Sequence, residues 1–210
     1  MTKLAELDDA ACLEAWRGGD PAAGQELFGR YYEPVARFFL NKVGDASSDL
    51  IQRTFLACVE GMNRYRGDGS FRSYLFAIAY RQLCRHYRDR GGDPVDLTSV
   101  SACNLDPSLS GVVAEREEIR LFMAGLREIP LELQVVLELH YWEQCSVAEI
   151  ARALELPEGT VKSRLRRGRE QLRSAVERLA ATPHLANSTI GGFETWARDV
   201  RAKSPRAAGS

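Results

Sequence analysis

The chain contains 210 residues, 45% of them hydrophobic, and carries a formal net charge of −1. This composition fits one or two globular domains, and no uncharged apolar run approaches the ~20 residues needed to cross a membrane. The acidic N-terminus also lacks the basic start of a signal peptide, so we expect a cytoplasmic protein with no membrane insertion.

The chemistry-bearing residues argue against an enzyme. The five cysteines are scattered without a C-x-x-C pair, which is unlike a disulfide framework or a zinc finger. Cys84 and His86 come nearest to a metal site but lack further ligands at suitable spacing. The three histidines are isolated, and the sequence contains no glycine loop of the phosphate-binding type. We therefore expect no catalysis, no metal and no cofactor.

Charge is distributed unevenly along the chain. Residues 64–90 and 161–181 each hold seven basic and two acidic residues, whereas residues 91–160 hold four basic and 13 acidic residues. Basic patches in two separate regions, with acidic surface elsewhere, are typical of a protein that touches DNA at two places.

After an N-terminal segment (1–20), helical periodicity predicts a first domain over residues 21–90. It comprises helical structure at 21–44 and 49–61, a glycine-rich loop around Asp68, and a long helix at 70–90 that carries arginines outside. Apolar residues at helical spacing mark the expected inner faces: Leu27, Tyr31, Val35, Phe38, Phe39, Leu50, Ile51, Phe55, Leu56, Val59, Phe71, Leu75, Ile78, Ala79 and Leu83.

Residues 91–114 contain paired glycines, two Asp-Pro steps and scattered serines, which predict a flexible linker. A second domain is predicted over residues 115–181, with helices at 115–129 and 131–142. Because the chain has no β-alternating segment of useful length, we expect an all-α fold.

The second domain ends in the pattern of a helix-turn-helix. Ser146 and Glu149 form a capping box at the start of one helix, and Pro157 suits the first position of the next. A basic face at the end of such a pair is typical of a DNA-reading helix in the major groove. The outward residues are Lys162, Ser163, Arg164, Arg166, Arg167, Arg169 and Arg173.

Taken in order, three segments resemble the extracytoplasmic-function sigma factors of bacterial RNA polymerase, in the sigma-70 superfamily. They are DLIQRTFL from residue 49, YRGDGSFRSYLFAIA from residue 65, and LPEGTVKSRLRRGREQLR from residue 156. The resemblance implies that residues 21–90 are sigma region 2 and residues 115–181 are sigma region 4. It also implies two partners, core RNA polymerase and promoter DNA, and promoter recognition, promoter melting and transcription initiation as the function. An anti-sigma factor commonly accompanies this family, although no residue here requires one.

The resemblance assigns two sets of residues in the first domain. Polymerase binding falls on Asp49, Gln52, Arg53, Phe55 and Leu56, although Phe55 and Leu56 are equally explained as core residues. Capture of the minus-ten element falls on Tyr65, Arg66, Gly67, Asp68, Gly69, Ser70, Phe71, Tyr74, Arg81, Gln82, Arg85 and Arg88. Glycines allow the backbone to approach a flipped base, and aromatic flanks supply stacking surface.

The chain departs from the family pattern at three positions. Arg81 replaces a frequent Asn and Arg85 a frequent Asp, which strengthens attraction to the DNA backbone and leaves the minus-ten sequence preference open. Glu155 stands in the turn where Gly is common, so that either the turn differs or strain is stored there. For the minus-thirty-five element, the resemblance matches Lys162, Ser163, Arg166 and Arg167 to the DNA contacts, and phosphate contact is expected for Arg164, Arg169 and Arg173.

A C-terminal extension (182–210) follows the second domain. Phe193, Trp196 and Val200 share one face of a predicted short helix over 192–201, behind two glycines. We expect this helix to dock on a domain or a partner and to regulate the protein.

A stand-alone helix-turn-helix regulator that binds an operator remains an alternative. It explains the second domain equally well but leaves the basic aromatic helix of the first domain and the long linker without a role.

Overall fold

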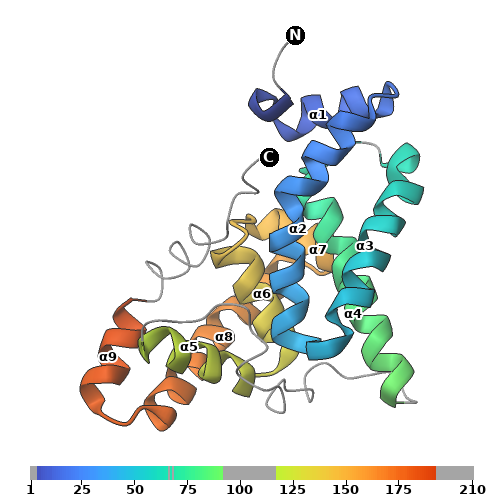
Figure 1. Ribbon diagram of the computed structural model, residues 1–210. Helices are drawn as coiled ribbons and strands as arrows, with labels where there is room; N and C mark the ends of the chain where they lie inside the picture. The colour runs from blue at the N-terminus through green and yellow to red at the C-terminus, as the bar shows by residue number, and fades with distance from the viewer. Residues whose placement is uncertain (1–3, 66, 68, 92–116, 193–210) are drawn as a thin grey trace.

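The computed structural model describes residues 4–65, 67, 69–91 and 117–192, and these residues form helices joined by short turns (Figure 1). The all-α prediction is therefore confirmed for the described residues. None of the described helices is long and apolar enough to span a membrane. The predicted linker (91–114) lies outside the described residues, apart from Gly91.

The N-terminal half of the chain contains one helix that the sequence analysis did not predict. Its helical content at 21–44 is a single helix despite the internal Pro34, and the N-terminal segment adds a helix of its own. The helices are α1 (Asp9–Arg17), α2 (Pro21–Val43), α3 (Ser47–Gly61) and α4 (Phe71–Gly91), with 3-10 turns at Leu4–Glu6, Gly44–Ala46 and Met62–Arg64. Most of the predicted apolar residues face inward, with Leu56 and Val59 as exposed exceptions and Phe55 half-buried.

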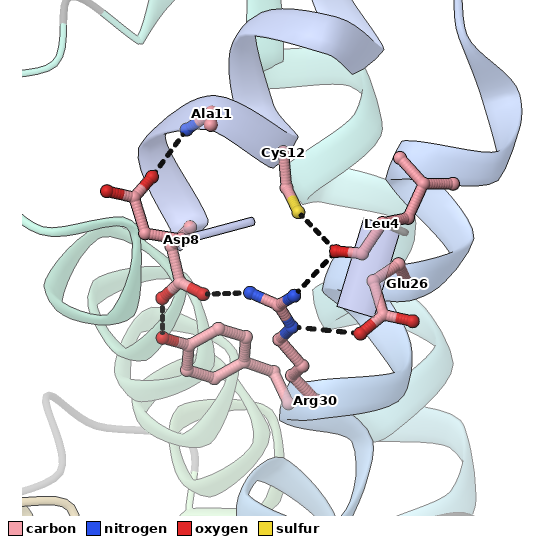
Figure 2. A network of polar contacts seen from close by, with 8 residues as sticks. Leu4, Asp8, Ala11, Cys12, Glu26 and Arg30 are labelled. Atoms are coloured by element: carbon pink, nitrogen blue, oxygen red, sulfur yellow. Dashed lines mark hydrogen bonds and ion pairs between the residues drawn. The ribbon is translucent and has the colours of Figure 1, made fainter. Parts of the chain in front are cut away.

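A polar network fixes α1 on α2 (Figure 2). Arg30 of α2 donates hydrogen bonds of 3.1 Å each to Asp9, Glu26 and the Leu4 carbonyl oxygen. The second carboxylate oxygen of Asp9 accepts from the hydroxyl of Tyr31. Charge-assisted bonds of this kind are directional, so they set the orientation of α1 where only Cys12 and Leu13 of that helix are fully buried.

The second domain follows the predicted order and adds one further helix. Helix α9 begins with Thr182 as its cap and Pro183 in its first turn, and it packs on α5 and α8. The helices are α5 (Glu117–Glu128), α6 (Leu131–Tyr141), α7 (Val147–Leu154), α8 (Glu158–Leu179) and α9 (Pro183–Gly191). The predicted tail helix with Phe193, Trp196 and Val200 lies outside the described residues.

The two domains pack against each other, with α7 of the second domain lying along α4 of the first (Figure 1). Their buried apolar residues form one continuous cluster. The structure thus describes a closed arrangement of the domains.

We predict that Asp9→Ala lowers the free energy of unfolding by about 1–2 kcal/mol, because the Tyr31 hydroxyl loses its acceptor and Arg30 loses one of its three acceptors. Urea denaturation followed by circular dichroism measures the loss. Glu14→Ala, on the exposed side of the same helix, is the control and should stay within about 0.5 kcal/mol of the parent chain. Equal losses in the two variants would contradict the proposed role of the network.

Candidate nucleic-acid interface

The turn between α7 and α8 is built from local backbone chemistry. The Ser146 hydroxyl accepts from the Glu149 amide at 3.2 Å, and the Glu149 carboxylate accepts from the Ser146 amide at 2.9 Å, which confirms the predicted capping box. Glu155 ends α7 in the left-handed region with φ 56° and ψ 45°. A non-glycine residue is strained there, so the turn keeps its geometry without its customary glycine.

The position predicted for Pro157 is wrong by one residue. Pro157 is the N-cap of α8, because its carbonyl oxygen already accepts from the amides of Thr160 and Val161, at 2.9 and 3.2 Å. Helix α8 therefore begins at Glu158. The proline has no amide hydrogen to donate, but none of the hydrogen bonds of the helix requires one at this position.

Helix α8 is seated on α5 and α6 by one buried stripe. Val161, Leu165 and Leu172 are buried, and a Cβ placed on Gly168 would lie 3.2 Å from the Leu137 side chain. Because the inner side is fixed in this way, the opposite side of α8 faces solvent.

The solvent side of α8 carries the predicted basic row. Lys162, Ser163, Arg166, Arg167, Arg169 and Arg173 are all exposed. Arg166 and Arg173 form i,i+4 ion pairs of 3.0 Å with Glu170 and Glu177. Such exposed pairs contribute little to stability and can rearrange when phosphates approach.

Arg164 lies apart from this row. Its guanidinium pairs at 2.5 Å with Glu132 of α6, whose carboxylate is buried, and its own side chain is only 20% exposed. In this arrangement Arg164 neutralises a buried carboxylate, and the predicted phosphate contact would require this pair to open.

In the first domain, two tyrosines hold the glycine-rich loop. The rings of Tyr65 and Tyr74 stack with centroids 4.4 Å apart, and the Tyr65 hydroxyl donates to the Gly69 carbonyl oxygen at 2.6 Å. Gly67 and Gly69 have φ of +82° and +114°, which side chains rarely tolerate. The predicted residues Arg66 and Asp68 lie outside the described residues.

The aromatic residues next to this loop fall into two groups. Tyr65 and Tyr74 are partly exposed, whereas Phe71 is buried and packs edge-on against Tyr31 with ring centroids 5.4 Å apart. Phe71 therefore offers no stacking surface to a base in the described conformation, in contrast to our expectation. On α4, Arg81, Arg85 and Arg88 are exposed and Gln82 is half-buried, so these four remain accessible.

Helix α7 covers the loop and the start of α4. The Ser70 hydroxyl donates to the Glu149 carboxylate, and Arg81 pairs with Glu155 at 3.4 Å. A Cβ on Gly69 would lie 2.6 Å from a guanidinium nitrogen of Arg152. Partial burial would raise the pKa of Glu149, but the bonds from Ser70 and Ser146 outweigh this effect and lower it.

The outer side of α3 is partly apolar. Asp49 and Arg53 form an exposed ion pair of 2.9 Å, and Gln52 lies beside them. Leu56 is 60% exposed, whereas Phe55 is half-buried between Phe28 and Tyr32. The core interpretation of Leu56 is thus wrong.

Sequence reasoning missed two residues of this surface. Tyr32, on α2, is half exposed and stacks on Phe55, and Val59 is 44% exposed one turn after Leu56. The spacing of Val59 predicts a core residue, which is wrong. The apolar residues of α3 cover a wider part of the helix surface than the part that packs against the rest of the domain. The sequence shows the first of these, and only the structure shows the second.

Two segments of the chain match known protein families. Residues 27–92 match the family described as sigma-70 region 2, and residues 119–172 match the family described as sigma-70, region 4. The RNA polymerase sigma-H factor of Pseudomonas aeruginosa is 28% identical over 189 residues, covering 84% of this chain and 97% of that protein. The ECF RNA polymerase sigma-E factor of Haemophilus influenzae is 26% identical over 185 residues, covering 83% and 98%.

A similar fold occurs in a solved structure. The sigma factor RpoE of Bartonella quintana, in complex with the anti-sigma factor NepR, matches with a TM-score of 0.59 and 20% identity. The match covers 73% of this chain and 96% of that one. At this identity the likeness concerns the fold.

We predict that Arg164→Ala and Arg167→Ala, on the same helix, differ in their effect on stability. Arg164→Ala should lower the free energy of unfolding by about 3 kcal/mol, because it leaves the buried carboxylate of Glu132 unpaired. Arg167→Ala should change it by less than about 0.5 kcal/mol, since Arg167 is exposed. Chemical denaturation of both variants measures the difference, and a mild Arg164→Ala would show that its ion pair is not structural.

Proposed function

Because this chain belongs to the extracytoplasmic-function sigma factors of the sigma-70 family, which direct transcription initiation, we propose that it recognises its promoters through two separate surfaces. The first surface is the loop at 65–71 with α4, for the minus-ten element. The second is the solvent side of α8, for the minus-thirty-five element. We further propose that it acts in the cytoplasm, where it binds core RNA polymerase.

The observation that carries the proposal is the exposed basic row of α8. Lys162, Arg166 and Arg167 point away from a firmly seated helix, as a side that enters the major groove must. An arginine can bind guanine with two hydrogen bonds, which contributes about 1–3 kcal/mol of discrimination per base pair. Arg169 and Arg173, further along the same helix, would contact phosphates.

The loop supports strand capture at the minus-ten element. Gly67 keeps the backbone open to a close approach, because nothing lies within 4 Å of a Cβ placed there, and the stacked Tyr65 and Tyr74 offer an aromatic platform. Stacking of ~1–3 kcal/mol per base would offset the few kcal/mol that unpairing of a flipped base costs. This balance would allow the chain to open promoter DNA by binding alone. Arg81, Arg85 and Arg88 would then neutralise the phosphates of the captured strand.

For core polymerase we propose the outer side of α3. Leu56 and Val59 present an apolar patch bordered by the polar side chains of Asp49, Gln52 and Arg53. An apolar centre with a polar rim is the usual composition of a protein interface.

The central test is run-off transcription with bacterial core polymerase on a library of promoter fragments. The chain should produce promoter-selective transcripts that depend on polymerase, and Arg166→Ala/Arg167→Ala should reduce them at least tenfold by losing ~2 kcal/mol or more of DNA discrimination. Tight binding to duplex DNA alone, with no stimulation of polymerase, would instead favour the operator-binding regulator.

We predict that Leu56→Asp weakens binding to core polymerase more than tenfold, because it places a charge in the centre of an apolar contact. Leu179→Asp is the matched control, since Leu179 is a 39% exposed leucine at the end of α8. Binding is measured by competition with a labelled sigma factor for core polymerase. Similar losses in the two variants would exclude α3 as the polymerase contact.

We also propose regulation by the C-terminal extension and by an anti-sigma factor, the kind of partner that the Bartonella protein binds. Helix α9 buries Ala186 and Thr189 against the second domain, so truncation after Ala181 would uncover α5 and α8. Truncation after Gly192 keeps α9 and removes residues 193–210, which include Phe193, Trp196 and Val200. If this shorter chain showed unchanged promoter output and unchanged polymerase binding, the proposed regulatory role of residues 193–210 would be contradicted.

A further inference from the structure

The last residue of α1, Arg17, reaches the start of the loop at 65–71. Its Nη2 donates to the carbonyl oxygen of Met62 at 3.0 Å and also to the carbonyl oxygen of Tyr65. Its guanidinium carbon lies 5.5 Å from the centroid of the Tyr65 ring. An exposed side chain of the N-terminal segment, to which the sequence alone assigns no role, thus contacts both the backbone and the ring of Tyr65.

These contacts occur where helical backbone ends. The 3-10 turn Met62–Arg64 is followed by Tyr65 in an extended conformation, with φ −69° and ψ 114°. The Tyr65 amide closes the turn on the Met62 carbonyl oxygen at 3.2 Å, and Arg17 links that oxygen to the carbonyl oxygen of Tyr65 itself. An arginine near the end of a helical segment can bind its last carbonyl oxygens. Arg17 therefore caps this turn from another helix and sets the direction in which the chain enters the loop.

The Tyr65 side chain is held at the same time by its neighbours in the loop and by α1. Its ring stacks on Tyr74 with centroids 4.4 Å apart, and its hydroxyl donates to the Gly69 carbonyl oxygen at 2.6 Å. Arg17 adds a contact from a helix outside this segment. An aromatic platform binds a base more tightly when its ring is already oriented, because ordering a side chain on binding costs conformational entropy.

Helix α1 gives Arg17 a fixed origin. The network around Asp9 anchors its first turn on α2. At its other end, Trp16 packs edge-on against Phe28 with ring centroids 5.0 Å apart. A Cβ on Gly24 would lie 2.7 Å from Nε1 of Trp16, so the indole lies closer to α2 than a side chain at that position would allow. Because Arg17 directly follows Trp16, its backbone is held in place on α2.

We propose that Arg17 is a positioning residue of the minus-ten site and holds Tyr65 in the orientation that receives a captured base. This inference rests on the proposed function of the loop. Arg17 acts through Tyr65 and not on the phosphates of the strand, because its Nη2 is engaged by two carbonyl oxygens and its guanidinium lies over the ring. Its loss should therefore weaken the stacking of one base and leave the contacts with the DNA backbone intact.

The test uses the full chain assembled with core polymerase, on a promoter found by run-off transcription. A fluorescent adenine analogue in the template strand of the minus-ten element reports the ratio of open to closed promoter DNA. Arg17→Ala should lower this ratio at least about fivefold, within the range that loss of one base-stacking contact produces. Tyr65→Leu should lower it as much or more. The double variant should be no worse than Tyr65→Leu alone, since the two residues act on one contact.

Single abasic positions along the non-template minus-ten strand separate positioning from other roles. At the position whose base stacks on Tyr65, removal of that base should abolish the effects of Arg17→Ala and Tyr65→Leu alike. A direct phosphate contact, or a general loss of domain structure, would leave the effect of Arg17→Ala at every abasic position. That result would overturn the proposal.

Two controls exclude effects of charge and of polymerase binding. Arg120→Ala makes the same charge change on the exposed side of α5 and should stay within about twofold of the parent chain, because solvent-exposed charges outside the site are screened. Competition with a labelled sigma factor should show that Arg17→Ala binds core polymerase like the parent chain. A loss of polymerase affinity as large as the loss of promoter opening, or an equal effect of Arg120→Ala, would overturn the positioning role.

The outcomes separate this inference from the proposed function. Normal promoter opening by Arg17→Ala, with Tyr65→Leu impaired, would overturn the role of Arg17 alone. Normal opening by Tyr65→Leu would overturn the stacking function of the loop and, with it, the role of Arg17. Absence of promoter-selective transcription by the parent chain would overturn the proposed function of the whole chain.

Discussion

The placement of the two domains depends on a buried ammonium and a buried carboxylate, those of Lys42 and Glu138. Removing each of these ions from water costs several kcal/mol. Their mutual attraction compensates for this cost only when the two groups are in direct contact, which requires one particular alignment of α2 and α6. Burial accordingly lowers the pKa of Lys42 and raises that of Glu138, against the attraction between them. The apolar cluster that continues across the two domains would by itself tolerate sliding. The buried ion pair within this contact is specific in register, and both of its ions are rehydrated if the contact opens.

The helices that sequence reasoning identified are those with a wide apolar stripe, since periodicity reports the side of a helix that is buried. Helix α1 was not predicted because it buries only Cys12 and Leu13. Its orientation is set by the hydrogen bonds of Arg30, which lies on another helix. Helix α9 buries only the small residues Ala186 and Thr189. Its Thr182-Pro183 start was a readable signal, because threonine caps a helix and proline suits the first turn.

The exposure of the basic residues of α8 could be predicted from the sequence. The apolar stripe identifies the buried side of the helix, so the basic residues must lie on the opposite, solvent-facing side. The partner of a particular side chain could not be predicted when that partner comes from a distant segment, as with Arg164 and Glu132 or Ser70 and Glu149. The aromatic residues near the loop show the same limit. Phe71 and Phe76 are core residues, whereas Tyr65 and Tyr74 form the exposed stack, and only the packing of α4 distinguishes the two groups.

The order of the elements along the chain has a consequence during synthesis. The first domain is complete once Gly91 has been added, but the residues that cover its loop, Glu149 to Glu155, are made later. At ~5–20 residues per second, the ribosome needs ~3–13 s to make the intervening chain. For that interval the loop at 65–71 of each nascent molecule has no α7 over it, and the acidic segment that carries α7 is the next part of the chain to be made.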